Sequence, residues 1–455
     1  MSRFLSLYFV LLAASGAVSA QEYTVLQELG SPGNPGGLWV DAGIAQSRGG
    51  RLFITSGLGT PAAFAVGTDS SYQVLHNFGS ASAPLTGVIL ATDGNYYGVS
   101  RESGAHKLGF AFRMTKDGDV KVLHNFTGGS DGAQPWAIMQ SVEGDFYVTT
   151  EGDGGAAGDP AGSILRMTAD GDMTLLHAFS GSDGASPMIL VQGTDFRFYG
   201  VTTNGGAYGG TSGYGTIFRI SSTGDFELLH SFDNTDGAIP QAGLTAANDG
   251  NFYGTTYEGG AGGTGTLFRM TPSGEFTVLH DFVDGPAADP QGRMVQASDG
   301  NLYGALLVGG GGAGYGLIFR ATLDGVVTPI QNFTAAGGFD ADSALIQHTN
   351  GELYGGTQVG GKYNAGTIYS LDLGLPPFVS YLPTYGRAGA EVEILGQGFG
   401  NSTEVFFNGK RAARTIVNPT FIEATVPSGA STGPITVTTE NGTLASNIVF
   451  IVHPN

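Results

Sequence analysis

The sequence predicts an all-β protein, a seven-bladed β-propeller followed by a small immunoglobulin-like β-sandwich. Three observations lead to this fold class. A glycine-rich unit of about fifty residues recurs along most of the chain. Each copy of the unit holds four short strand-like runs, which turn sequences separate. The repeat stops near residue 373, and a different series of short strands follows it.

The copy between Asp236 and Phe282 shows the unit most clearly. Its strands are expected at 242–247, 251–256, 266–271 and 276–282, and tight turns such as Asn248-Asp249-Gly250 separate them. Four short antiparallel strands in about fifty residues are typical of a propeller blade. A stacked β-solenoid is the alternative, but its coils are usually shorter. An aromatic residue marks the second strand of each copy: Phe53, Tyr97, Tyr147, Tyr199, Tyr253, Tyr303 and Tyr354. These positions predict seven blades.

The two ends of the repeat region predict that the propeller closes into a ring. The last copy runs through residues 366–369 and stops at Leu373 without a fourth strand. Residues 23–29, near the start of the chain, have the composition of that missing strand and resemble residues 278–282 of another copy. We therefore expect residues 23–29 to pair near residues 366–371 and to complete the seventh blade.

The repeat combines the motifs DG-x-x-P, DG-x-x-YGTT, GG, GT-x-FR and L-x-x-F in a constant order. On these motifs, residues 35–371 resemble the bacterial GloVer tandem-repeat family. The first and last copies depart most, and in the first copy Phe53-Ile54-Thr55 stands in place of YGTT and the GT-x-FR motif is missing. The resemblance implies an exported, propeller-like protein, and it implies no particular activity.

Residues 378–455 are expected to form a second domain after a stiff linker at 373–377. Its strands are expected at 391–395, 404–407, 421–426, 435–439 and 448–452, with turns at Asn408-Gly409 and Asn441-Gly442. The runs GQGF at 396–399, VFFNG at 405–409 and VPSGA at 426–430 resemble an IPT/TIG immunoglobulin-like domain. In exported bacterial proteins this resemblance implies a spacer or an adhesive module.

The start of the chain and its composition predict where the protein works. Residues 1–20 are expected to be a signal peptide, because Arg3 precedes an apolar run and Val18-Ser19-Ala20 fits a cleavage site. We therefore expect a secreted, extracellular or cell-surface protein, with the periplasm as an alternative. No later run reaches the roughly 18 apolar residues of a membrane span, so no membrane insertion is expected. A monomer is expected as well, and residues 21–372 are assigned to the propeller.

Charge and cysteine content exclude several kinds of partner and chemistry. The chain has 19 lysines and arginines against 39 aspartates and glutamates, a formal net charge of -20. Phosphate backbones repel such a surface, so nucleic acid is not expected as a partner. The absence of cysteine excludes thiol catalysis, thiolate zinc sites and iron–sulfur clusters.

Several conspicuous polar residues recur at fixed repeat positions and are expected to be structural. Equivalent residues of successive blades are too far apart to share a metal ion. The histidines are therefore expected to make structural hydrogen bonds, and the arginines to pair with carbonyls or carboxylates between blades. The histidines are His76, His124, His177, His230 and His280, and the arginines are Arg113, Arg166, Arg219, Arg269 and Arg320.

The Asp-Gly pairs between blades allow two interpretations. Aspartate caps its own turn and glycine accepts a positive φ, so turn formation is the main expectation. Calcium is the alternative, because oxygen-rich loops bind it, although the EF-hand pattern is missing. The candidate calcium ligands are Asp131, Asp183, Asp236 and Asp284. No other cofactor is expected.

Binding is expected on the face where the long loops emerge. These loops join the second and third strands or successive blades, and they vary most between copies. Tyrosines among glycines and amides suit contacts with sugars or peptides, whereas a solvated rim with incidental aromatics is the alternative. The candidate ligand-binding residues are Arg101, His106, Tyr208, Tyr214, Tyr257, Glu258 and Tyr363.

The sequence contains no G-x-S-x-G, HExxH or phosphate-loop motif, so we expect binding rather than catalysis. The main hypothesis is an extracellular protein that binds a glycan or a protein on the long-loop face, with the immunoglobulin-like domain as a spacer or adhesive module. One alternative is a polysaccharide hydrolase or lyase that uses acidic residues of the central channel. The other is a structural component of the envelope or matrix.

Overall fold

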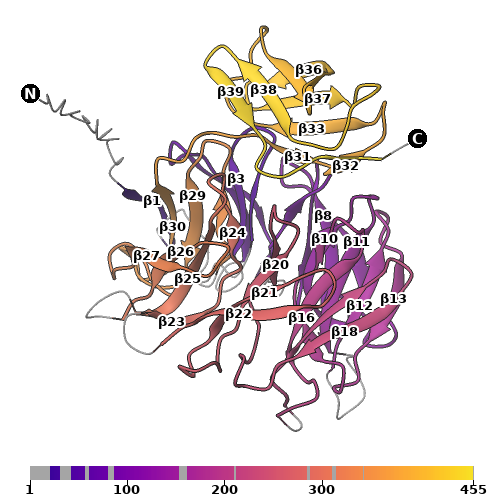
Figure 1. Cartoon of the computed structure of the whole chain (residues 1–455), viewed down its shortest axis with the longest axis vertical. Coiled ribbons are helices and arrows are strands. Elements are labelled where there is room, and N and C mark those ends of the chain that lie inside the picture. Colours follow the sequence, from indigo (N-terminus) through magenta and orange to yellow (C-terminus); the bar gives the residue numbers. More distant parts are fainter. Residues whose placement is uncertain are drawn as a thin grey trace, which may run out of the picture.

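The computed structural model describes residues 21–30, 43–56, 61–79, 87–152, 161–209, 212–283, 287–309, 314–341 and 343–453. The expected signal peptide and Asp284 lie outside these ranges. Seven small antiparallel sheets form a propeller, and a β-sandwich lies against one of its faces (Figure 1). The all-β class and the seven blades predicted from the sequence are confirmed.

The first four blades follow one another along the chain. Blade 1 contains β2 (Ile44–Gln46), β3 (Leu52–Ser56), β4 (Ala62–Val66) and β5 (Tyr72–Asn77). Blade 2 contains β6 (Ile89–Leu90), β7 (Tyr96–Ser100), β8 (Phe110–Met114) and β9 (Val120–Asn125). Blade 3 contains β10 (Ala133–Gln140), β11 (Phe146–Gly152), β12 (Ser163–Met167) and β13 (Met173–Ala178). Blade 4 contains β14 (Ala185–Pro187), β15 (Val191–Gln192), β16 (Phe198–Asn204), β17 (Thr216–Ile220) and β18 (Phe226–Ser231).

The remaining three blades complete the ring. Blade 5 contains β19 (Leu244–Ala246), β20 (Phe252–Thr255), β21 (Thr266–Met270) and β22 (Phe276–Asp281). Blade 6 contains β23 (Ala287–Pro290), β24 (Val295–Gln296), β25 (Leu302–Gly309), β26 (Leu317–Ala321) and β27 (Val327–Asn332). Blade 7 contains β28 (Ile346–Gln347), β29 (Leu353–Thr357), β30 (Thr367–Asp372) and β1 (Glu22–Glu28). The inner strands of blades 4 and 6 are each interrupted, so two segments pair with one second strand.

The seventh blade closes with the N-terminal strand β1, which is its outermost strand. β1 pairs antiparallel with β30, from Glu22 opposite Asp372 to Glu28 opposite Thr367. The side chains of Leu26 and Leu29 are buried, and the Tyr23 ring stacks on Tyr369 with 5.0 Å between ring centroids. The pairing expected between residues 23–29 and residues 366–371 is therefore present.

The blades pack face to face through their second and third strands, whose side chains are almost all buried. The tyrosine of one blade stacks on the phenylalanine at the start of the next blade's second strand. The ring centroids lie 4.1 Å apart for Tyr97 and Phe146, and 4.0 Å apart for Tyr199 and Phe252. The YG-type motif of the repeat is thus an aromatic contact between blades, which is why it recurs around the ring.

A recurring glutamine at the end of the inner strand also joins neighbouring blades. Its Oε1 accepts a hydrogen bond from a backbone N–H in the turn of the preceding blade, and in most copies its Nε2 donates to its own turn. The ring-closing member is Gln46, which accepts from Thr349 N at 3.0 Å. The complete set is Gln46, Gln140, Gln192, Gln296 and Gln347. Sequence reasoning overlooked these glutamines.

The C-terminal domain is a sandwich of two four-stranded sheets. One sheet contains β31 (Ser380–Leu382), β33 (Glu391–Leu395), β37 (Phe421–Thr425) and β36 (Ala413–Asn418). The other contains β35 (Lys410–Arg411), β34 (Glu404–Phe407), β38 (Ile435–Thr439) and β39 (Gly442–Ala445). β32 (Tyr385–Gly386) and β40 (Ile451–Val452) form a short parallel pair. Asn408 and Gly409 both have positive φ, as a tight hairpin turn requires.

The sandwich contacts the short turns between first and second strands on both sides of the ring (Figure 1). In the blade 1 turn, Arg48 forms an ion pair with Glu393 and lies over the Phe421 ring. In the blade 7 turn, Thr349 Oγ1 accepts a hydrogen bond from Gln397 Nε2 at 2.9 Å. In the blade 4 turn, the Phe196 ring packs 5.3 Å from the Tyr385 ring. The sandwich therefore lies across the axis of the propeller.

Glu393 is expected to make the docking of the sandwich depend on pH. Burial raises its pKa to about 7, although Arg48 opposes this rise, and the charges of Glu423 and Asp93 add to it. When the interface opens, the carboxyl regains its ordinary pKa of 4.5. The docked state therefore binds the proton more tightly. This contribution to stability is complete below pH 4.5 and is lost as the pH rises through about 7.

The measurement is the melting temperature of the wild type and of Glu393→Gln across this pH range. The wild type should lose stability relative to Glu393→Gln as the pH rises, because glutamine cannot ionise. A wild type that gains stability relative to the variant would show that the ion pair with Arg48 outweighs burial.

Candidate functional site

The two faces of the propeller differ in what covers them. The sandwich contacts the short turns of one face. The loops between second and third strands, and those between blades, lie on the other face, which we call the long-loop face. All seven candidate ligand-binding residues lie in these loops. The structure brings only some of them near the axis.

The recurring histidines and the Asp-Gly aspartates, which the sequence analysis treated separately, contact each other. His124 Nε2 lies 2.9 Å from Asp131 Oδ2, and the same contact recurs in the next two blades. Asp131 also accepts hydrogen bonds from Thr127 N and Thr127 Oγ1 within its own turn. Burial raises the pKa of Asp131, but these hydrogen bonds outweigh burial and leave it below its ordinary value.

This geometry gives Asp131, Asp183 and Asp236 a structural role in their turns. Each carboxylate accepts hydrogen bonds from the histidine of its blade and from its own loop. Within the described ranges, no three His, Cys, Asp or Glu side chains are grouped so that they could hold a metal ion. The fourth candidate, Asp284, lies outside those ranges.

Asp131→Asn is expected to lower the free energy of unfolding by about 1–2 kcal/mol, because an amide cannot accept all the hydrogen bonds of the carboxylate. The loss should be the same with millimolar calcium and with a chelator. Melting curves under both conditions test this expectation. Asp117→Asn is the matched control, because Asp117 is exposed and pairs only with exposed Lys116. A wild type that calcium stabilises and Asp131→Asn that it does not would instead favour the calcium interpretation.

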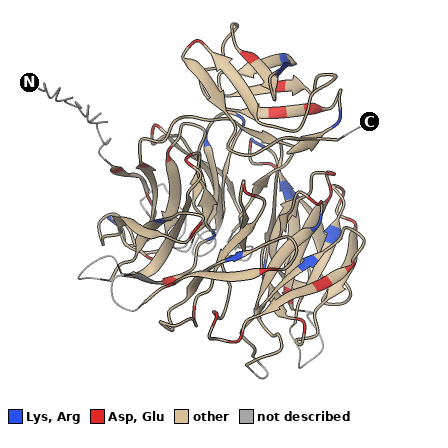
Figure 2. Cartoon of the chain, viewed as in Figure 1, with Lys and Arg blue, Asp and Glu red and all other residues tan. Residues whose placement is uncertain are grey.

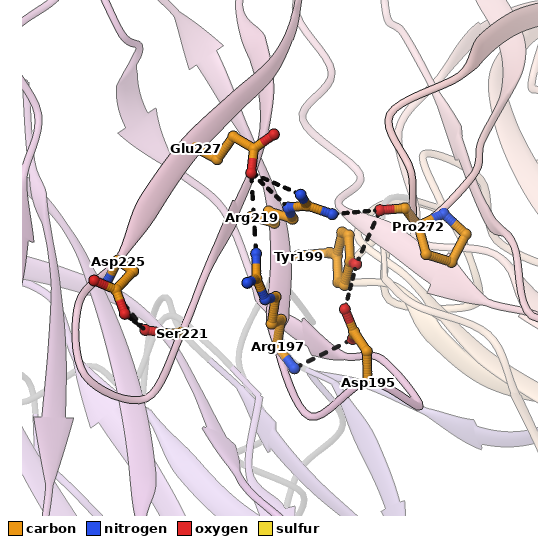
Figure 3. Close-up of polar contacts among 8 residues, drawn as sticks. All are labelled: Asp195, Arg197, Tyr199, Arg219, Ser221, Asp225, Glu227 and Pro272. Carbon is orange, nitrogen blue, oxygen red and sulfur yellow. Dashed lines mark hydrogen bonds and ion pairs between the residues drawn. The ribbon is translucent and has the colours of Figure 1, made fainter.

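The recurring arginines occupy the one third-strand position that is not fully buried. Figure 3 shows the blade 4 example, in which Arg219 binds the Glu227 carboxylate at 2.7 Å and donates to the Pro272 carbonyl of the next blade at 2.6 Å. Tyr199 beside it donates to Asp195 at 2.9 Å. For Arg219 the partners are those expected from the sequence: a carboxylate and a backbone carbonyl.

Arg101 is one candidate that the structure places near the axis. It forms an ion pair with Glu151 of the next blade, and its guanidinium lies 5.3 Å from the centroid of the Trp136 ring. Burial raises the pKa of Glu151, and Arg101 opposes this rise. Trp136 follows Pro135 at the long-loop end of the inner strand and lines the central cavity. Sequence reasoning missed Trp136, although it is one of only two tryptophans in the chain.

Tyr257 is the second candidate near the axis. Its N–H donates to the Ile239 carbonyl at 3.0 Å, just before the inner strand of blade 5. Burial raises the pKa of the Tyr257 hydroxyl, and the negative charges of Asp289, Glu258 and Asp340 raise it further. Burial also raises the pKa of Asp340. The charges of two carboxylates that the sequence analysis did not name, Asp289 and Asp340, therefore act on the Tyr257 hydroxyl.

Asp289 and Asp340 occupy one repeat position with an unusual backbone. The residue in this position has a positive φ between 53° and 63° in five blades: Gln134, Ser186, Ile239, Asp289 and Asp340. In four of them proline follows, which normally disfavours this conformation. The N–H of that residue donates to a loop carbonyl of the preceding blade, as between Ile239 and Tyr214. The side chain at this position differs between these five blades, except that blades 6 and 7 both have aspartate. The repeat therefore varies at this position.

The other candidates lie farther out on the loops. Tyr208 and His106 are exposed, and the Lys362 ammonium lies 5.2 Å from the centroid of the Tyr363 ring. Tyr214 packs against a buried cluster of blades 4 and 5, as Trp136 does, but unlike Trp136 it is not among the residues that line the cavity. The residues that converge are thus Arg101 with Trp136, and Tyr257 with Asp289 and Asp340.

The central channel contains a cavity of about 660 Å³ that all seven blades line. Its wall is mostly apolar, with Ile138, Met188 and Ile189 among the lining residues. Leu382, Pro383 and Thr384 of the sandwich line it as well. Within the described part of the chain, no aspartate or glutamate lines this cavity. The acidic channel that the hydrolase hypothesis needs is therefore not found there.

Fold and site together define a class of protein: a seven-bladed propeller whose short-turn face carries an immunoglobulin-like sandwich. The chain matches the Gloeobacter/Verrucomicrobia repeat over residues 18–211 and 207–391, and it belongs to this family. Residues 376–451 match the IPT/TIG domain. Both resemblances seen in the sequence are confirmed. No curated protein matches the sequence.

Solved structures with the same fold have diverse functions. A fungal alcohol oxidase of the AA5 family, in complex with copper, is 13% identical with a TM-score of 0.52, covering 90% of this chain and 96% of the oxidase. PorZ, a surface component of the type-IX secretion system of Porphyromonas gingivalis, is 15% identical with a TM-score of 0.50. That match covers 93% of this chain and 60% of PorZ. At these identities the likeness extends to the fold alone.

Acidic residues are spread over the loops and strands of the propeller, whereas the sandwich has nearly equal numbers of acidic and basic residues (Figure 2). Among the described residues, no helix has the length and hydrophobicity that crossing a bilayer requires.

Proposed function

We propose that the chain is an exported binding protein that holds an extracellular ligand, a glycan or a protein, on the long-loop face. The sandwich acts as a spacer or adhesive module on the opposite face. The observation that carries this proposal is the placement of Tyr257, Asp289 and Asp340 in the neighbouring blades 5, 6 and 7 at the long-loop face, where the charges of both aspartates act on the Tyr257 hydroxyl. We call this group, together with Trp136, Gln241 and Gln291 beside it, the channel mouth.

Of the two ligand classes, a glycan fits the channel mouth better. Aromatic rings stack on sugar rings, and carboxylates accept hydrogen bonds from sugar hydroxyls. Tyr257 and Trp136 supply the rings, and Asp289 and Asp340 supply the carboxylates. The sandwich contacts turns on both sides of the ring, so a ligand of the channel would approach from the long-loop face.

A glycan and protein array with the mature chain, run with and without calcium, tests this proposal. Tyr257→Ala should weaken the binding found there by roughly tenfold, which corresponds to about 1.4 kcal/mol. Tyr208→Ala is the matched comparison, because Tyr208 is an exposed loop tyrosine away from the mouth. Equal losses in both variants would indicate a ligand that covers the whole face. No saturable binding to any array member would favour the structural role.

Polysaccharide hydrolysis is a second candidate that one observation favours. Burial raises the pKa of Asp340, and an acid catalyst needs such a raised pKa. Sugar released from a polysaccharide panel by the wild type, and lost in Asp340→Asn, would favour hydrolysis. Binding without release in both proteins would favour the binding role.

A further inference from the structure

Arg293 is the one charged residue among those that line the central cavity in the described part of the chain. It lies between β23 and β24, the two inner segments of blade 6, and its side chain is half-buried. Desolvation by the surrounding protein lowers the pKa of its guanidinium. An arginine nevertheless keeps its charge in proteins. The cavity therefore contains a fixed positive charge in mostly apolar surroundings.

Within the described residues, Arg293 differs from the arginines that pair with a carboxylate. Arg219, Arg166, Arg48 and Arg101 each form an ion pair with a carboxylate. Among the described residues, none forms a hydrogen bond or ion pair with the Arg293 side chain. A desolvated charge without a partner costs free energy. A ligand with a negative charge would supply this partner.

The repeat position of Arg293 is small in most other blades. Arg293 lies three residues before the recurring glutamine of its blade. The residues three positions before that glutamine, or before its counterparts Leu90 and Ala246, are Gly43, Gly87, Ala137, Ile189, Gly243 and Ala344. A Cβ built on Gly243 would lie at an ordinary contact distance of 3.9 Å from Arg293 Cδ, so the arginine stem packs beside this glycine. Arg293 thus breaks the repeat at a level where small neighbours leave space along the axis.

Two glutamines supply further hydrogen-bonding groups. Gln241 and Gln291 follow the prolines of blades 5 and 6 and line the same cavity. The structural glutamines join neighbouring blades through their side chains, as Gln296 does with Asn248 N at 2.8 Å. In contrast, the side chains of Gln241 and Gln291 form no hydrogen bond within the described residues. Their amides are available to a ligand beside Arg293.

We infer that the central cavity binds an acidic sugar, with the sugar carboxylate on the Arg293 guanidinium. The guanidinium fork matches a carboxylate in two parallel hydrogen bonds. Gln241 and Gln291 would bind ring hydroxyls, and Trp136 supplies a ring for stacking. The volume of about 660 Å³ lies within the range of small-molecule pockets. This inference rests on the proposed function, and it places the acidic sugar in the cavity, which Trp136, Gln241 and Gln291 of the channel mouth line.

Calorimetry with the mature chain tests the ligand class. Glucuronate and galacturonate, as monomers and as short oligouronides, are compared with glucose and galactose. The uronates should bind and the neutral sugars should not. Tighter binding of the oligouronide than of the monomer would identify the end of a polysaccharide as the source of the ligand. Equal affinity for the oligouronide and the monomer would identify a free sugar acid. Equal binding of glucuronate and glucose would overturn the inference. So would sulfate that displaces glucuronate as well as glucuronate itself does, because that would indicate a site for any oxyanion.

Three variants test the role of Arg293. Arg293→Met should weaken uronate binding by about tenfold to a hundredfold, the effect of losing hydrogen bonds to a charged group. Arg293→Lys should retain part of the uronate affinity, because lysine keeps the positive charge but cannot form the two parallel hydrogen bonds of the guanidinium. Gln241→Glu should weaken binding by adding a negative charge. Arg293→Met should melt at or above the wild-type temperature, because it removes an unpaired desolvated charge. Unchanged uronate affinity in Arg293→Met would overturn the inference.

The two proposals can fail separately. Neutral glycans that bind and are lost in Tyr257→Ala, but not in Arg293→Met, would uphold the proposed function and overturn the acidic-sugar inference. Uronate binding lost in Arg293→Met and unchanged in Tyr257→Ala would uphold the cavity site and contradict the role given to Tyr257.

Discussion

Deletion of residues 21–29 should lower the melting temperature of the propeller by roughly 10 °C, because blade 7 then loses its outermost strand. The deletion removes the pairing of β1 with β30 and the burial of Leu26 and Leu29. Each buried leucine contributes about 1.5–3 kcal/mol, and the lost strand pairing adds to this. The free edge of β30 would also be open to pairing with a second copy. Differential scanning calorimetry and light scattering measure the two effects.

Two further variants separate strand loss from general damage. Leu26→Asp should reproduce much of the loss by placing a charge in the buried cluster of blades 7 and 1. Glu22→Ala, on the exposed end of the same strand, should have little effect. A synthetic peptide of residues 21–29 should restore part of the lost stability to the truncated chain. Wild-type melting in the truncated chain would contradict the closing role of β1.

Arg48→Ala should loosen the sandwich from the propeller, at a cost of roughly 2–3 kcal/mol above neutral pH. The substitution leaves the Glu393 carboxylate without its cation in a mostly buried interface. It also removes the contact of the guanidinium with the Phe421 ring. Both partners keep some exposure, so the expected cost lies below that of a fully buried pair. Limited proteolysis at the 373–377 linker and the unfolding free energy both report this change.

Arg411→Ala is the matched control for Arg48→Ala. Arg411 also pairs with a glutamate, Glu404, but both side chains are exposed. Exposed pairs contribute about 0–1 kcal/mol, so this variant should behave like the wild type. If the two variants cost the same free energy, the Arg48 pair does not hold the interface.

The fold could be predicted from the sequence because the repeat displays it many times. Each copy repeats the same turn sequences and the same buried aromatic, so agreement between copies outweighs the ambiguity of any single strand. Boundaries were less accurate where turns extend into strands. The first strand expected at 242–247 is β19 at Leu244–Ala246, because Gly243 has a φ of 74°. In the C-terminal domain, β31, β32, β35, β36 and β39 were not predicted.

The site could be predicted only to the level of a face. Residues that differ between copies are visible in the sequence, and on that basis Arg101 and Tyr257 were named. Which of these variable residues meet at the axis depends on how seven blades approach one another. Trp136 and Asp289 lie near the outer ends of inner-strand segments, and Asp340 lies just before one, in positions that resemble ordinary turn sequence. Arg293 was missed because a single arginine, which lies in the break between β23 and β24, does not reveal from the sequence that it lacks a partner.

The position of β1 has a consequence for the order in which the chain folds. β1 is among the first segments of the described chain, yet its partner β30 ends only at Asp372. Blades 1 to 6 can form from local contacts as they are synthesised, but the ring cannot close until almost the entire propeller exists. Until then, β1 has no partner and the two ends of the propeller are exposed edges. The slow step of folding should therefore be the meeting of the two ends, a contact of very long sequence separation.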